Sequence, residues 1–158
     1  MNILFVCSGN VFRSMAAEYC LKDYLEKNKI KGINVSSAGT HFGYDHANAV
    51  IEEELMHFGI DASKHEKRNV TKEILEEADL IVAMAGYHQV FLKESLGFES
   101  VLFSEVCYGV KRSVDDNWEA ISNYKTDKTA NREYIKNTVD FIHDSIPKFA
   151  ENFKKFIK

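Results

Sequence analysis

Residues 7–14 of the chain read CSGNVFRS. The apolar run before it, residues 3–6, has the length and composition of a buried strand, and the residues after it read as the start of a helix. Cys7 therefore ends a strand, while Arg13 and Ser14 lie at a helix entrance. Backbone N–H groups converge in such a loop and the helix N-terminus adds partial positive charge, so we expect a seat for a tetrahedral anion above the sulfur.

The residue types of this loop suit phosphoryl transfer to sulfur. Helix N-termini and neighbouring arginines favour the thiolate form of a cysteine, so we expect Cys7 to be ionised at neutral pH. Arg13 has a planar fork that can hold two phosphate oxygens at once, and Ser14 can donate its hydroxyl to the thiolate. Gly9 and Asn10 tolerate the positive φ of a tight loop. These features predict a phosphocysteine, which divides one difficult step into two easier ones.

Length and composition predict a single domain, residues 1–158, with a core of its own. Hydrophobic residues make up 45% of the chain, which argues against disorder, and no apolar window approaches ~18 residues, so we expect no membrane insertion. The net charge of −4 argues against a nucleic-acid binder. Three cysteines without motif spacing predict neither a disulfide framework nor a zinc site. We therefore expect a cytoplasmic protein that uses no metal and no cofactor.

Apolar runs of strand length alternate with helical patterns, which predicts an α/β domain with a parallel sheet. The expected strands are residues 2–6, 33–37, 80–84 and 100–103, and the expected helices are residues 14–28, 46–58 and 87–95, with a short helix that Thr71 caps and that runs through Glu77.

The C-terminal region carries one long apolar stripe. Its members recur at spacings of four and three and are Ile135, Val139, Ile142, Ile146, Phe149, Phe153 and Phe156. The stripe keeps its register through Pro147, so we predict one helix with a kink near that proline, packed on the sheet.

The loop has the form C-x-G-N-x-x-R-S and resembles that of the low-molecular-weight protein tyrosine phosphatases. The resemblance extends along most of the chain: residues 36–40 look like the family's S-A-G-T segment, and residues 65–71 look like its H-x-x-R segment. It implies a four-stranded parallel sheet with helices on both faces. It also implies a protein-tyrosine-phosphatase, a monomer or weak dimer, that acts on a phosphotyrosine-containing protein or peptide.

The resemblance also assigns roles around the loop. Cys7 would be the nucleophile and Arg13 the catalytic arginine. The substrate phosphate would be bound by the loop residues Ser8, Gly9, Asn10, Val11, Phe12 and Ser14. Ser37 would brace Asn10, and His65 would hold the hydroxyl of Ser14.

A phosphatase of this kind needs a general acid for the leaving phenolate, and the same carboxylate then activates water. In the family a D-P-Y segment in a late loop supplies it. When Trp118 is aligned with the Tyr of this segment, Asp116 takes the acid position and Asn117 stands in place of Pro. Asp115 is the alternative acid.

A phosphotyrosine needs flat apolar walls around the phosphate seat. The candidates are Phe12, Phe42, Tyr44 and Trp118, all in predicted loops near the seat. Each of them could instead belong to the core.

Three other activities stay open. A thioredoxin-coupled arsenate reductase of this fold needs two further cysteines after the third strand, and residues 83–98 contain none. Protein arginine phosphatases carry Thr at the position of Val11. Two departures from the family pattern favour a non-catalytic phosphopeptide-binding module: Asn117 stands in place of Pro, and Ala85 stands where the family usually has Asp. An intact nucleophile, arginine and acid argue against that module.

Overall fold

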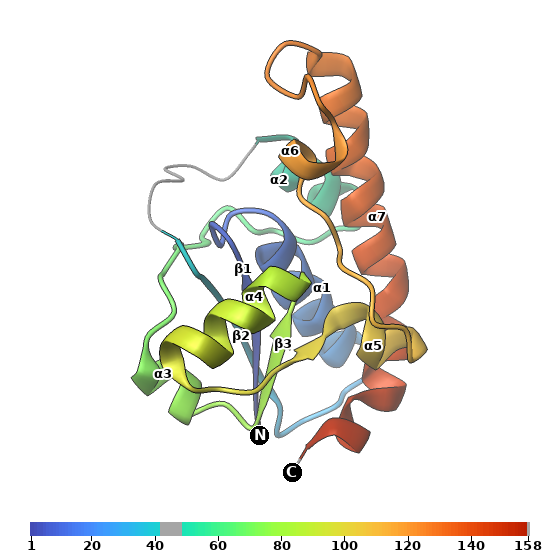
Figure 1. Cartoon of the computed structure of the whole chain (residues 1–158). Helices are drawn as coiled ribbons and strands as arrows, with labels where there is room; N and C mark the ends of the chain where they lie inside the picture. Colours follow the sequence, from blue (N-terminus) through green and yellow to red (C-terminus); the bar gives the residue numbers. More distant parts are fainter. Residues whose placement is uncertain (42–48, 158) are drawn as a thin grey trace.

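A four-stranded parallel sheet forms the centre of the molecule in the computed structural model, which describes residues 1–41 and 49–157 (Figure 1). The strand order is β2-β1-β3-β4. The strands are β1 (Asn2–Cys7), β2 (Asn34–Gly39), β3 (Leu80–Ala83) and β4 (Val101–Leu102). The predicted fold class, an α/β domain with a four-stranded parallel sheet, is confirmed.

The side chains of β1 alternate between two apolar clusters, as the period of a strand requires. Ile3 and Phe5 belong to the larger cluster, together with buried residues of helices α1 (Arg13–Lys27) and α7 (Lys128–Asn152). Leu4 and Val6 belong to the smaller cluster on the opposite face. Both faces of the sheet are therefore covered, which is why β3 and, after Asn2, β1 are apolar.

The remaining helices divide between these two faces (Figure 1). Helices α2 (Ala49–His57) and α5 (Phe103–Tyr108) pack with α1 and α7. Helix α3 (Lys72–Glu76) and the π-helical turn η1 (Leu92–Leu96), which continues α4 (Gly86–Phe91), contribute to the smaller cluster. A short helix, α6 (Asn117–Ala120), lies near the N-terminal half of α7. As predicted, Thr71 caps α3 by accepting a hydrogen bond from the Ile74 N–H.

The expected end of the fourth strand was wrong. The strand was expected to include Phe103, but this residue begins α5, and its ring packs against Phe5 and Phe149 in the core. The second strand, expected at residues 33–37, lies at Asn34–Gly39. The expected start of the second helix, residue 46, lies outside the described residues and stays a prediction, and α2 is described from Ala49 onward.

The C-terminal stripe forms one helix through Pro147, as predicted. Ile146 and Phe149, on either side of the proline, are fully buried, and their packing outweighs the backbone hydrogen bond that proline cannot make. The α-helix ends at Asn152, and the last aromatic residues form a 3₁₀ turn, η2 (Phe153–Phe156). The kink stays a prediction.

Candidate active site

The candidate loop lies where the sheet changes winding direction. In the order β2-β1-β3-β4, the chain leaves β1 toward β2 on one side and β3 toward β4 on the other. The carboxyl ends of β1 and β3 therefore open a crevice, which is where such sheets bind ligands. The loop from residue 8 to residue 12 follows β1, and α4 follows β3.

The end of β2 supports this loop by direct backbone contact. A Cβ atom added to Gly39 would lie 2.7 Å from the carbonyl oxygen of Ser8 and 3.0 Å from the amide nitrogen of Asn10. Glycine in the S-A-G-T segment is thus required for the close approach of two backbones.

Cys7 and Ser14 form a directed contact. The Sγ of Cys7 lies 2.9 Å from the Oγ of Ser14. The side-chain amide of Asn10 donates to the same Oγ at 3.2 Å. Because that oxygen accepts from Asn10, its own proton is free to point at the sulfur, which suits a thiolate.

Asn10 is the anchor of the loop. It adopts a left-handed conformation with φ of 56°, which asparagine tolerates better than most residues. Its amide nitrogen donates to Ser37 Oγ at 2.6 Å, and its amide oxygen accepts from the Arg68 N–H at 2.9 Å. Ser37 in turn donates to the buried carboxylate of Glu18 at 2.5 Å. A fully buried amide is thus fixed in orientation by hydrogen bonds at both ends.

The resemblance implied that His65 holds the hydroxyl of Ser14, but His65 contacts the backbone of Asn10 instead. Its Nε2 lies 2.7 Å from the backbone carbonyl oxygen of Asn10. The hydroxyl of Ser14 is oriented by the Asn10 side chain instead. His65 therefore reaches the loop through the backbone, one step further from the sulfur than expected.

The guanidinium of Arg13 is fully buried and holds the surrounding segments together. Its Nη1 donates to the carbonyl oxygen of Val114 at 2.8 Å. Its Nη2 directs two protons at three acceptors: Ser8 Oγ at 3.2 Å, the Tyr87 hydroxyl oxygen at 3.0 Å and Asp116 Oδ2 at 2.5 Å. Both terminal nitrogens are therefore fixed by residues from distant parts of the sequence.

The Nε of Arg13 is buried and has no hydrogen-bond partner among the described residues. Burial by itself lowers the pKa of Arg13, but the negative charges of Cys7 and Asp116 outweigh it, and the pKa is raised above its ordinary value. A permanent charge with one unpaired donor beside the sulfur is a site that can accept an anion oxygen.

The two candidate acids lie in different surroundings. Asp116 is buried and forms an ion pair with Arg13, while its other oxygen caps α6 by accepting from the Asn117 N–H at 2.9 Å. Asp115 is exposed, and its backbone carbonyl accepts from the Tyr134 hydroxyl. The Asp116 carboxylate is the one that the turn directs at the loop.

A cavity of about 200 Å³ opens over this constellation. Cys7 and Asp116 line it together with Gly9, Val11, Phe12, Ile51, Asn117, Trp118, Tyr124 and Ile135. The Trp118 side chain is 45% exposed at the cavity, whereas Phe12 is buried beneath it. The two other aromatic candidates, Phe42 and Tyr44, lie outside the described residues.

Sequence reasoning missed four polar residues that contact this site. Tyr87, His88 and Glu119 form hydrogen bonds around Ser8 and Arg13, and Glu18 accepts from Ser37. Tyr87 and His88 follow the third strand by a few residues, so the rule that carboxyl ends of parallel strands share one edge could have indicated them. No sequence signal pointed to Glu18 or Glu119.

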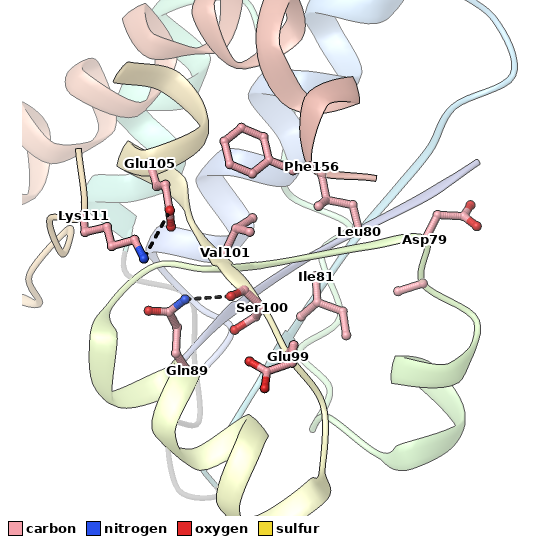
Figure 2. Close-up of a pocket in the computed structure, with 11 residues that line it drawn as sticks. Asp79, Leu80, Ile81, Gln89, Glu99, Ser100, Val101, Glu105, Lys111 and Phe156 are labelled. Carbon is pink, nitrogen blue, oxygen red and sulfur yellow. Dashed lines mark hydrogen bonds and ion pairs between the residues drawn. The ribbon is translucent and has the colours of Figure 1, made fainter. Parts of the chain in front are cut away.

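A larger depression of about 540 Å³ lies at the side of the sheet along β3 and β4 (Figure 2). Gln89 donates to the Ser100 carbonyl there, and Lys111 pairs with Glu105. None of the predicted site residues lines it. Its side chains include no nucleophile beside an anion-binding group, so the cavity at Cys7 is the candidate active site.

Within residues 1–41 and 49–157, no three His, Cys, Asp or Glu side chains gather in a group that could hold a metal ion. None of the helices found there has both the length and the apolar character that a bilayer crossing demands.

The model of the low molecular weight phosphotyrosine protein phosphatase family matches residues 2–158. The chain belongs to this family. It is similar to the low molecular weight protein-tyrosine-phosphatase Ptp of Acinetobacter johnsonii, with 33% identity over 97 residues, 61% of this chain and 66% of that protein. It is equally similar to the protein-arginine-phosphatase of Bacillus subtilis, with 33% identity over 103 residues, 61% of this chain and 64% of that protein.

The matched region thus spans just under two thirds of the length of these two relatives of the phosphatase family. A solved structure of the arginine phosphatase YwlE, a mutant with a phosphorylated active site serine, has a TM-score of 0.82 at 27% identity and covers 98% of this chain and 97% of that chain. The family members that are similar to this chain therefore include a phosphatase named for tyrosine and a phosphatase named for arginine.

Proposed function

We propose that this member of the phosphatase family is a protein-tyrosine-phosphatase that works through a phosphocysteine on Cys7. The observation that carries the proposal is the proximity of three groups. Cys7 and Asp116 line one cavity, and the buried guanidinium of Arg13 pairs with the Asp116 carboxylate, although these two residues are 103 positions apart. Nucleophile, anion-binding group and acid are the parts that this reaction needs.

In the first step the thiolate of Cys7 attacks phosphorus, and the bond between phosphorus and the phenolic oxygen breaks. Asp116 gives its proton to that oxygen, and Arg13 with the loop amides neutralises the phosphoryl oxygens. In the second step Asp116 takes a proton from water, which attacks phosphorus, and the P–S bond breaks. The hydroxyl of Ser14, 2.9 Å from the sulfur, stabilises the departing thiolate.

Without substrate, a carboxylate oxygen of Asp116 occupies one Nη2 donor of Arg13. A bound phosphate oxygen would compete for this donor. Release of Asp116 from Arg13 would turn its carboxyl toward the leaving oxygen. Binding of the substrate and positioning of the acid are therefore coupled through a single guanidinium.

The cavity walls favour phosphotyrosine over phosphoarginine. Trp118, Phe12 and Ile51 supply flat or apolar surface for a phenyl ring. Val11 lines the same cavity with a side chain that carries no hydroxyl, in contrast to the Thr of arginine phosphatases. The absence of cysteine from residues 83–98 disfavours arsenate reduction.

The experiment is a comparison of substrates at neutral pH in the presence of a chelator. We expect turnover of p-nitrophenyl phosphate, and a higher kcat/KM for a phosphotyrosine peptide than for a phosphoarginine peptide of the same sequence. A preference for phosphoarginine would replace the tyrosine proposal with the arginine one. Orthophosphate binding without any turnover would indicate the binding module.

Replacement of Asp116 by asparagine is expected to lower kcat on the phosphotyrosine peptide by about 10²-fold, since the leaving phenolate then lacks its proton donor. The inhibition constant of orthophosphate should stay the same or fall, because the carboxylate no longer competes for Arg13. Steady-state kinetics with orthophosphate as inhibitor measures both. Asp115→Asn is the matched control and should change kcat less than threefold. The opposite order of the two variants would assign the acid to Asp115.

A further inference from the structure

Two buried side chains at the start of α4 have no part in the steps above. His88 is completely buried and Tyr87 is half-buried, directly beside Ser8 and Arg13. Buried polar groups carry a desolvation cost unless their hydrogen bonds are satisfied. Each of these hydrogen bonds fixes the direction of the next, from His88 to Glu119.

The Nδ1 of His88 accepts a hydrogen bond from the Ala85 N–H at 3.0 Å. The ring proton therefore lies on Nε2, which donates to Ser8 Oγ at 3.0 Å. Burial, with the positive charge of Arg13 as a second cause, lowers the pKa of His88 to about 2. The ring is thus neutral at neutral pH, with its proton on Nε2.

The hydroxyl of Ser8 accepts from His88 and also from Arg13 Nη2 at 3.2 Å. Its single proton is left for the Tyr87 oxygen, 3.2 Å away. The Tyr87 oxygen also accepts from Arg13 Nη2 at 3.0 Å. The Ser8 side chain is therefore committed to this network, and Ser8 can offer a substrate phosphate only its backbone N–H.

Tyr87 links Ser8 and Arg13 to the turn that carries Asp116. Burial raises its pKa, so the phenol stays protonated, and it donates to Glu119 Oε2 at 3.2 Å. The same Glu119 oxygen accepts the backbone N–H of Asp116 at 2.8 Å and lies 3.8 Å from Arg13 Nη1. Glu119 thus joins the turn that carries the acid to the guanidinium that holds the phosphate.

We propose that Tyr87 and Glu119 are positioning residues, the last two members of a directed hydrogen-bond chain from His88 through Ser8 that holds Arg13 and the Asp116 turn in one geometry. The proposal rests on the proposed function, because it assigns Arg13 to phosphate and Asp116 to the leaving group.

The test uses the full chain and two readouts, kcat/KM on p-nitrophenyl phosphate and the dissociation constant of orthophosphate. Trp118 is the one tryptophan of the sequence and lines the cavity, so its fluorescence follows orthophosphate binding in the absence of turnover. Tyr87→Phe is expected to lower kcat/KM about tenfold and to raise the dissociation constant about fivefold. Tyr108→Phe, which removes a hydroxyl bonded to Ser145 between α5 and α7, is the matched control and should change neither value.

Glu119→Gln and Glu119→Ala both remove the charge, but only glutamine keeps an acceptor for Tyr87 and for the Asp116 N–H. We expect kcat/KM of Glu119→Ala to be about fivefold below that of Glu119→Gln. In the Tyr87→Phe background this ratio should shrink to about twofold, because one of the two donors to Glu119 is gone. Thermal unfolding verifies that all variants are folded.

The outcomes separate the two proposals. A wild-type chain that binds orthophosphate without turnover, but loses affinity in Tyr87→Phe, keeps the positioning chain and removes the phosphatase activity. The proposed hydrogen-bond chain is overturned if the wild type is active and Tyr87→Phe has the same kcat/KM and orthophosphate affinity. It is also overturned if Glu119→Ala and Glu119→Gln have equal kcat/KM. A wild type that neither binds orthophosphate nor turns over substrate overturns both.

Discussion

Replacement of Cys7 by serine is expected to abolish turnover, with a fall in kcat of at least about 10⁴-fold on p-nitrophenyl phosphate and on a phosphotyrosine peptide. A serine hydroxyl is not ionised at neutral pH, and neither neighbouring polar group can act as its base, because Asn10 donates to the hydroxyl of Ser14 and the Ser14 proton is directed at position 7. Orthophosphate should bind at least as tightly as to the wild type, because a negative sulfur is removed from beneath the anion. Steady-state kinetics and Trp118 fluorescence measure the two effects.

Cys107→Ala is the matched control for this variant. Cys107 is buried in α5, and burial raises its pKa to about 12, so its thiol is neither ionised nor accessible. Its removal should leave kcat unchanged and cost only some stability. If Cys7→Ser kept its turnover and Cys107→Ala lost it, the nucleophile would have to be assigned to Cys107 instead of Cys7.

Replacement of Arg13 by lysine should lower kcat/KM by about 10³-fold, although the charge is kept. The guanidinium reaches Val114, Ser8, Tyr87 and Asp116 with two nitrogens, and its Nε has no hydrogen-bond partner within residues 1–41 and 49–157. A lysine ammonium is a single point charge and cannot hold these partners and two phosphate oxygens together. The loss should appear both in kcat and in the dissociation constant of orthophosphate.

Arg132→Lys serves as the control for this variant. Arg132 is half-exposed and pairs with Glu53 on α2, where exposed ion pairs contribute little. Its replacement should leave kinetics and orthophosphate affinity within twofold of the wild type. If Arg13→Lys kept wild-type affinity for orthophosphate, the guanidinium would be a structural cation and the anion would have to be bound elsewhere.

The elements predicted best from the sequence are those with a local cause. The strand–loop–helix unit around Cys7 depends on fourteen consecutive residues, and the α7 stripe depends on a repeat within one helix. The errors fall where a distant contact overrides a local pattern. Phe103 follows apolar residues and has a high strand propensity. It nevertheless begins α5, where its ring is buried against Phe5 and Phe149.

From its sequence the chain offers Cys7, Arg13 and the segment around Asp116 as candidate site residues, because Cys7 and Arg13 share one short loop and the acidic pair stands beside an aromatic residue. Which groups those residues touch follows only from the fold. His65 contacts the backbone of Asn10, and Glu119 reaches Tyr87 across 32 residues. Such contacts depend on strand order and on loop conformation, and neither is encoded in the spacing of neighbouring residues.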